Sequence, residues 1–98
     1  MPLVTLTTDF GTNGPYVAAL KGVLLDGAPD APIVDVTHTI RPQNVREAAL
    51  VLAQACPWFP KKTLHVVVVD PGVGTERHIV YAEIGGQCYL TPDNGVLS

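Results

Sequence analysis

LHVVVV, residues 64–69, is the stretch that decides the fold, because every residue after His65 is a β-branched valine. A run without polar alternation predicts a strand that is covered on both faces, as in a parallel sheet. Two earlier segments, Leu3–Thr8 and Ile33–Val36, are also β-branched and aliphatic, and they predict two more strands. A mainly parallel sheet is therefore expected at the centre of the molecule.

Amphipathic helices are expected in both gaps between these strands. The first begins with Pro15 at its first helical position, where the missing N–H of proline costs nothing, and it ends at Gly27. The second runs from Val45 to Cys56, where apolar residues recur at helical spacing. Asn44 and Glu47 have the spacing of an N-cap and its capping-box partner.

Residues 79–84 and 88–90 predict two final strands that are joined at Gly85-Gly86, a typical hairpin turn. The resulting order is β-α-β-α-β-β-β, and strands that alternate with helices are typical of a parallel sheet with right-handed crossovers. We therefore predict an α/β fold: a Rossmann-like arrangement of three layers, with helices flanking a mainly parallel sheet and a terminal antiparallel hairpin.

The composition indicates one folded domain in 98 residues, since 47% of the residues are hydrophobic and only 15% are charged. No apolar run approaches the roughly 20 residues that span a bilayer, and the first residues lack the pattern of a secretory signal. The net charge of −3 disfavours a nucleic-acid surface.

The two cysteines, Cys56 and Cys88, are expected as reduced and mostly buried thiols of a cytoplasmic protein. The three histidines lack the spacing of metal ligands, so no metal site is expected. Trp58 and Phe59, which lie between two prolines, are expected to pack together as an apolar plug.

Polar clusters follow three of the strands, and ligands of open α/β sheets bind beyond the carboxyl ends of the strands. The clusters are Asp9–Thr12, Thr37–Thr39 and Asp70–Arg77, and we expect them to converge on one edge of the sheet. Asp9 either accepts hydrogen bonds from a vicinal diol, as acidic residues do with ribose in nucleotide folds, or caps its own loop. His38 is expected as a structural histidine that is hydrogen-bonded to a neighbouring loop.

Asp70 and Arg77 flank two glycines, Gly72 and Gly74, which permit a tight turn that would bring the two charged side chains together. The segment lacks the spacing and the lysine of a P-loop. The pair is either an ion pair that braces the loop, or a carboxylate that its arginine keeps ionised and that holds a water molecule.

Four motifs in register resemble the S-adenosylmethionine hydroxide adenosyltransferase family, the S-adenosylmethionine hydrolases that are related to the fluorinase and the chlorinase. The similarity extends from Leu3 to Ser98. It is carried by TDFG at 8–11, DVTHTI at 35–40, VVDPGVGT at 68–75 with Arg77, and PDNGVLS at 92–98.

The resemblance implies hydrolysis of S-adenosyl-L-methionine to adenosine and L-methionine, by attack of water or hydroxide at the ribose C5′, without a cofactor. It assigns Asp70 and Arg77 to the family's Asp-Arg-His triad and Asp9 to its ribose-binding aspartate, while the triad histidine falls beyond Ser98. It also implies that residues 3–98 are an incomplete N-terminal domain, truncated before a C-terminal β-barrel domain. The full-length protein is then a homotrimer, and residues 1–98 alone are inactive.

Asp70 and the short hairpin favour the hydrolase branch of the family. The halogenases resemble this chain but carry a tyrosine at the position of Asp70, a threonine at that of Val73 and a longer insertion where only residues 85–87 lie here. Two alternatives stay open: a halogenase and, in a different class, a non-catalytic module that binds adenosine or another nucleotide. The expected partner is a small molecule, not a nucleic acid or a membrane.

Overall fold

The computed structural model describes residues 3–42, 44–69 and 79–92. The elements follow the predicted order, with one additional turn of 3-10 helix, η1, after the second helix. They are β1 (Val4–Thr8), α1 (Tyr16–Gly27), β2 (Ile33–Thr37), α2 (Val45–Ala55), η1 (Cys56–Trp58), β3 (Leu64–Val68), β4 (Ile79–Ile84) and β5 (Gln87–Pro92).

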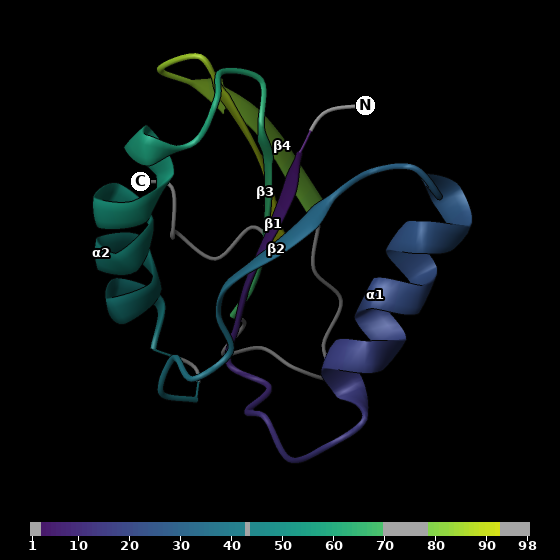
Figure 1. Cartoon of the computed structure of the whole chain (residues 1–98). Helices are drawn as coiled ribbons and strands as arrows, with labels where there is room; N and C mark the ends of the chain where they lie inside the picture. Colours follow the sequence, from purple (N-terminus) through teal and green to yellow (C-terminus); the bar gives the residue numbers. More distant parts are fainter. Residues whose placement is uncertain (1–2, 43, 70–78, 93–98) are drawn as a thin grey trace.

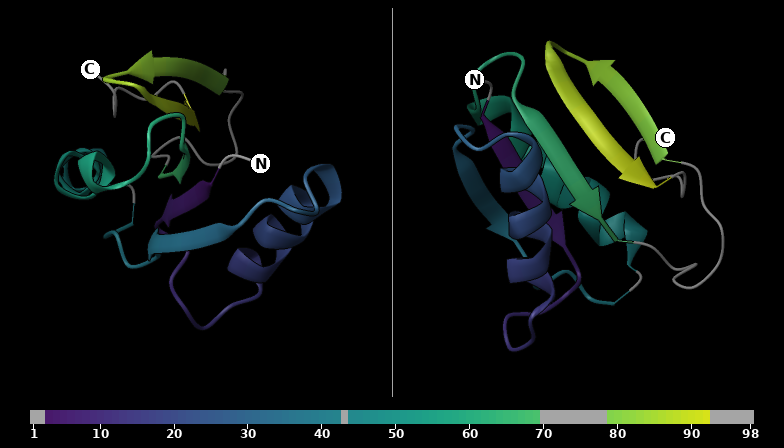
Figure 2. Two further views of the ribbon diagram at one scale, coloured as in Figure 1. Left: turned by 45° about the horizontal axis from the view of Figure 1, so that its top comes forward. Right: turned by 90° about the vertical axis from the view of Figure 1, so that its right-hand side faces the viewer.

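The strands form one sheet in the order β2-β1-β3-β5-β4. Strand β1 pairs in parallel with both β2 and β3, and β3 pairs in parallel with β5. Among the described strands, β4 alone runs antiparallel, as the edge strand that pairs with β5. Figure 2 shows this hairpin at one side of the sheet. The prediction of a mainly parallel sheet with an antiparallel hairpin is confirmed.

Helices lie on both faces of the sheet (Figure 1). Leu20 and Leu24 of α1 pack with Val66, whereas Leu52 of α2 packs with Val67. Successive side chains of a strand point to opposite faces, so the alternating valines of β3 supply one core to each helix. This confirms the three-layer arrangement and explains why the strand carries no polar alternation.

The helix ends agree with the predictions to within one residue. Helix α1 ends at Gly27, and Pro15 is its N-cap instead of its first helical residue. At α2 the Oδ1 atom of Asn44 accepts the Glu47 N–H at 2.9 Å, as predicted. The second half of the predicted capping box is not formed, because the Asn44 N–H donates to the Arg41 carbonyl at 2.9 Å. The Glu47 carboxylate instead accepts the N–H of Arg41 at 2.6 Å, which fixes the chain that leads into the helix.

The β4–β5 hairpin turns through Gly85 and Gly86, at φ of 60° and 83°. Positive φ at both central residues is the requirement of a type I′ turn, whose twist matches that of paired strands. A side chain at either position would therefore be strained.

A buried hydrogen-bond chain crosses the middle of the sheet on the α2 side. The Thr5 hydroxyl lies 2.6 Å from His65 Nδ1, and His65 Nε2 lies 3.1 Å from Gln87 Oε1. The Gln87 amide donates in turn to the carbonyls of Cys56 and Phe59. The chain ties three strands to η1, and the sequence alone did not indicate it.

The segment around η1 corrects one prediction. Trp58 is 88% exposed and is therefore not a packing plug. Phe59 is half-buried and makes a T-shaped contact with the His65 ring, with a centroid distance of 5.7 Å. Both cysteines are free thiols as predicted; Cys56 is fully buried and Cys88 half-buried.

Candidate active site at the carboxyl edge of the sheet

The carboxyl ends of β1, β2 and β3 meet at one edge of the sheet, at the lower end of the molecule in Figure 1. The N–H of Asp9, directly after β1, donates to the carbonyl of Val68 in β3 at 3.3 Å. The N–H of Gly11 donates to the carbonyl of His38, directly after β2, at 2.7 Å. Two of the three predicted polar clusters are therefore joined by their backbones.

Asp9 lies inside a tight turn that the Thr8 side chain stabilises. The Thr8 hydroxyl oxygen accepts the N–H of Phe10 at 3.2 Å, the pattern in which a threonine caps the residue two positions later. The turn places Asp9, a half-buried residue, at the sheet edge. A carboxylate at such an edge can accept two hydrogen bonds from a ribose diol, as acidic residues do in nucleotide-binding folds.

His38 lies beneath this turn and is 8% exposed. Its Nδ1 is 2.8 Å from the Thr8 hydroxyl oxygen, and its Nε2 is 2.8 Å from Asp35 Oδ1. An ionised carboxylate only accepts hydrogen bonds, so Nε2 carries a proton, and in the neutral ring Nδ1 accepts the Thr8 hydroxyl hydrogen. His38 thus occupies a structural position, as the sequence predicted.

Asp35 is also held by Lys21 of α1, whose Nζ donates to Oδ2 at 2.9 Å. Desolvation by burial acts to raise the pKa of Asp35, but the hydrogen bonds from Lys21 and His38 outweigh it and leave this pKa below its ordinary value. Asp35 therefore stays ionised and keeps its role as acceptor for His38 Nε2.

Phe10 links the same turn to the first helix. Its ring contacts that of Tyr16, the first residue of α1, at a centroid distance of 5.9 Å. Gly11 follows at φ 76°, where a β-carbon would be strained although the space around it is open. The loop that carries Asp9 is thus fixed by contacts with β3, β2 and α1.

Asp70 and Arg77, the predicted catalytic pair, lie outside the described residues. Val69 directly precedes Asp70 in the sequence and is fully buried. The relation of Asp70 and Arg77 to Asp9, and the choice between an ion-pair brace and a catalytic pair, therefore remain predictions from the sequence.

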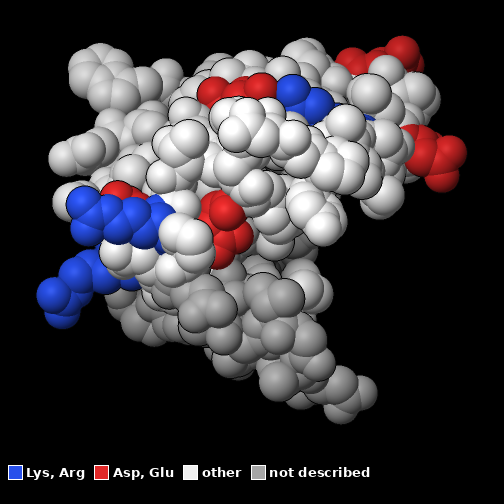
Figure 3. Space-filling view, turned by 90° about the horizontal axis from the view of Figure 1, so that it is seen from below, with Lys and Arg blue, Asp and Glu red and all other residues white. Residues whose placement is uncertain are grey.

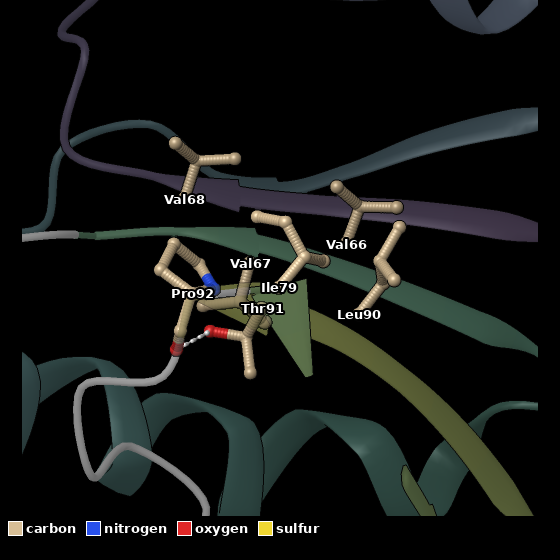
Figure 4. A pocket seen from close by; sticks show the side chains of 7 residues that line it. All are labelled: Val66, Val67, Val68, Ile79, Leu90, Thr91 and Pro92. Atoms are coloured by element: carbon tan, nitrogen blue, oxygen red, sulfur yellow. Dashed lines mark hydrogen bonds between the residues drawn. The ribbon is translucent and has the colours of Figure 1, made fainter. Parts of the chain in front are cut away.

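An apolar pocket of about 230 Å³ lies between β3 and the hairpin (Figure 4). Among the described lining residues, Thr91 alone carries a side-chain hydroxyl, which donates to the carbonyl of Pro92 at 3.3 Å. Among the described residues, no acid or base lines this pocket. The lining residues are Val66, Val67, Val68, Ile79, Leu90, Thr91 and Pro92.

Figure 3 views the molecule from below; some basic side chains adjoin one another at the left of this view, and another lies apart from them beside an acidic side chain. Within residues 3–42, 44–69 and 79–92, no group of three or more His, Cys, Asp or Glu side chains could hold a metal ion. In the same part of the chain, no helix is long and apolar enough to cross a bilayer.

The sequence matches the SAM hydroxide adenosyltransferase N-terminal domain over residues 4–98. This chain belongs to that family. The (R)-S-adenosyl-L-methionine hydrolase of Salinispora arenicola is 47% identical to it over 96 residues, which cover 98% of this chain and 36% of that protein.

A fluorinase from Nocardia brasiliensis is a more distant relative of this chain. It is 32% identical over 83 residues, which cover 85% of this chain and 28% of the fluorinase. The structure of an uncharacterized conserved protein from Thermotoga maritima superposes with a TM-score of 0.90 at 44% identity, over 97% of this chain and 37% of that one. The chain therefore spans just over a third of the hydrolase and structural relatives that it matches.

The sequence reasoning identified Asp9 and His38 at this edge but missed what connects them. Thr8 is the last residue of a buried β-branched run, and Asp35 precedes His38 by three residues. A hydroxyl residue that precedes a glycine loop is a known signal for a side-chain-capped turn. That signal could have identified Thr8, whereas the contact with His38 required the strand order.

Proposed function

We propose that this chain is the N-terminal α/β domain of an S-adenosylmethionine hydrolase. The proposed reaction converts S-adenosyl-L-methionine and water to adenosine and L-methionine. The single observation that carries the proposal is the contrast in similarity: 47% identity over 98% of the chain to a hydrolase, against 32% over 85% to a fluorinase.

In the proposed reaction, the oxygen of water forms a bond to the ribose C5′ while the bond from C5′ to sulfur breaks. The bonding electron pair stays on sulfur, which leaves as the neutral thioether of methionine, and water loses one proton to solvent or to a nearby base. The leaving group needs no general acid, because a sulfonium becomes neutral as it departs. The enzyme must instead hold a water molecule in line with the C–S bond.

Asp9, Asp70 and Arg77 are the residues to which we assign these tasks. Asp9 binds the ribose diol, which its place in a fixed turn at the sheet edge supports. Asp70 orients the attacking water and Arg77 stabilises its hydroxide character. The assignment of this pair rests on the sequence motif, since both residues lie outside the described part of the chain.

The proposal extends to the protein around this domain. A C-terminal β-barrel domain follows it, the protein assembles as a homotrimer in the cytoplasm, and the active site lies between the N-terminal domain of one subunit and the C-terminal domain of the next. The reaction uses no cofactor. The resemblance to the family supports these statements, and residues 1–98 alone are then inactive.

The name of the Salinispora arenicola relative specifies the (R) epimer of the substrate. We extend this selectivity to the present protein. A chiral pocket distinguishes the epimers because inversion at sulfur exchanges the positions of the methyl group and the methionine chain.

The proposal is tested by incubating the purified full-length protein with a mixture of the two sulfur epimers of S-adenosyl-L-methionine. We expect equal amounts of adenosine and methionine, with the remaining substrate enriched in the (S) epimer. Residues 1–98 alone and heat-inactivated protein serve as controls and should form neither product. Adenosine binding without any turnover would favour the non-catalytic module instead.

A further inference from the structure

We propose that Thr8 and His38 are positioning residues that hold Asp9 in the orientation that binds ribose. The inference rests on the proposed function, in which Asp9 accepts hydrogen bonds from the ribose diol. It adds two residues that touch no substrate and act only through the Asp9 turn.

Three backbone contacts surround Asp9 in the chain. The N–H of Asp9 donates to the carbonyl of Val68 at 3.3 Å. The N–H of Phe10 donates to the Thr8 hydroxyl oxygen at 3.2 Å, and the N–H of Gly11 donates to the carbonyl of His38 at 2.7 Å. His38 contributes twice, since its carbonyl holds Gly11 while its ring holds Thr8. Hydrogen bonds therefore fix the backbone both at Asp9 and at the two residues that follow it.

When the His38 ring is neutral, the hydrogen bonds among these side chains have one direction. Asp35 accepts from His38 Nε2, so Nδ1 of the neutral ring accepts the Thr8 hydroxyl hydrogen. Because the Thr8 hydroxyl donates its hydrogen to His38, its oxygen can accept the N–H of Phe10. Thr8 is fully buried, so no water competes for its hydroxyl.

Thr5, in the same strand as Thr8, serves as a matched control. Thr5 is as fully buried as Thr8, and its hydroxyl also bonds to a histidine Nδ1, that of His65 at 2.6 Å. Thr5 lies in the middle of the sheet, paired with His65, and not at the edge that carries Asp9. Loss of either hydroxyl costs stability, but only the loss at Thr8 releases the Asp9 turn.

The test measures adenosine binding by calorimetric titration of the full-length protein. We expect Thr8→Val to weaken binding by roughly 5- to 30-fold, the factor that corresponds to one or two lost hydrogen bonds. Thr8→Ser keeps the hydroxyl and should restore most of the affinity. Thr5→Val should lower the melting temperature while leaving the affinity unchanged.

A double-mutant cycle separates positioning from general damage. If Thr8 acts through Asp9, Thr8→Val should have little further effect on affinity in an Asp9→Ala background. Additive losses, or wild-type affinity in Thr8→Val, would overturn the inference while leaving the proposed function intact. Failure of the wild-type protein to bind adenosine would instead contradict the proposed function and, with it, the ligand assigned to Asp9.

Discussion

The Thr8 hydroxyl and the His38 imidazole lie 2.8 Å apart at the point where β1 ends. One partner belongs to the first strand and the other directly follows the second, so their contact couples two strand ends that are 30 residues apart in the chain. Asp9 follows Thr8 directly, and its position therefore depends on the pairing of β1 with β2. The pairing of these two strands is thus the way in which the fold sets the position of Asp9 in the candidate site.

Asp9→Ala in the full-length protein should weaken adenosine binding and raise KM. In the proposed site, removing the Asp9 carboxylate leaves the hydroxyl groups of the ribose diol unpaired, at a cost of about 1–3 kcal/mol. Calorimetric titration with adenosine measures this directly, with Asp30→Ala, at an exposed position between α1 and β2, as the control. Unchanged affinity in Asp9→Ala would remove Asp9 from the site.

Asp70→Asn and Arg77→Ala should each lower kcat by about 100-fold or more and change substrate affinity much less. Such a pattern identifies groups that act mainly in the transition state. The alternative, an exposed ion pair that braces the loop, would contribute only about 0–1 kcal/mol of stability. Measuring kcat and the melting temperature on the same variants distinguishes a catalytic pair from a structural ion pair. A near-normal kcat would mean that Asp70 and Arg77 only stabilise the loop.

The layered α/β fold could be predicted because its signals are local. The unbroken valines of β3 indicate burial on both faces, and Gly85-Gly86 indicates a turn, without any knowledge of distant contacts. Trp58 was predicted wrongly because its neighbours along the chain are apolar, whereas its exposure depends on where η1 lies relative to the sheet.

The candidate site could be predicted only in part for the same reason. The rule that ligands bind at strand ends indicated Asp9, and the structure places it beside the ends of β2 and β3. The bonds from His38 to Thr8 and Asp35, and from His65 to Thr5 and Gln87, depend on strand order and register. Neither spacing nor composition carries that information.

Thr7→Val should raise the melting temperature of the unliganded protein. The Thr7 hydroxyl is the one buried side-chain polar atom without a hydrogen-bond partner within the described residues, and such a group costs on the order of 1 kcal/mol or more. Thr5→Val is the matched control and should lower the melting temperature, because it leaves His65 Nδ1 without its donor. A lower melting temperature in Thr7→Val would contradict this explanation.

Stability should fall as the pH is lowered through the range in which histidine titrates. Desolvation by burial lowers the pKa of His65 below its ordinary value of 6.5, although the bond to Gln87 acts in the opposite direction. The unfolded chain therefore binds the proton more tightly, so the stabilising contribution is complete above pH 6.5 and is lost below it.

Melting temperatures measured between about pH 5 and 8 check this dependence. The wild-type protein should show a steeper fall on acidification than His65→Gln, whose amide does not titrate in this range. Equal slopes in the two proteins would mean that other groups account for the acid sensitivity.

The most direct test of the central claim is the fate of the water oxygen. The full-length protein is incubated with S-adenosyl-L-methionine in ¹⁸O-labelled water, and the adenosine formed is analysed by mass spectrometry. We predict one ¹⁸O atom in the 5′-hydroxyl group of adenosine and none in methionine. Adenosine without the label, or 5′-halogenated deoxyadenosine in the presence of chloride or fluoride with no labelled adenosine, would contradict hydrolysis at C5′.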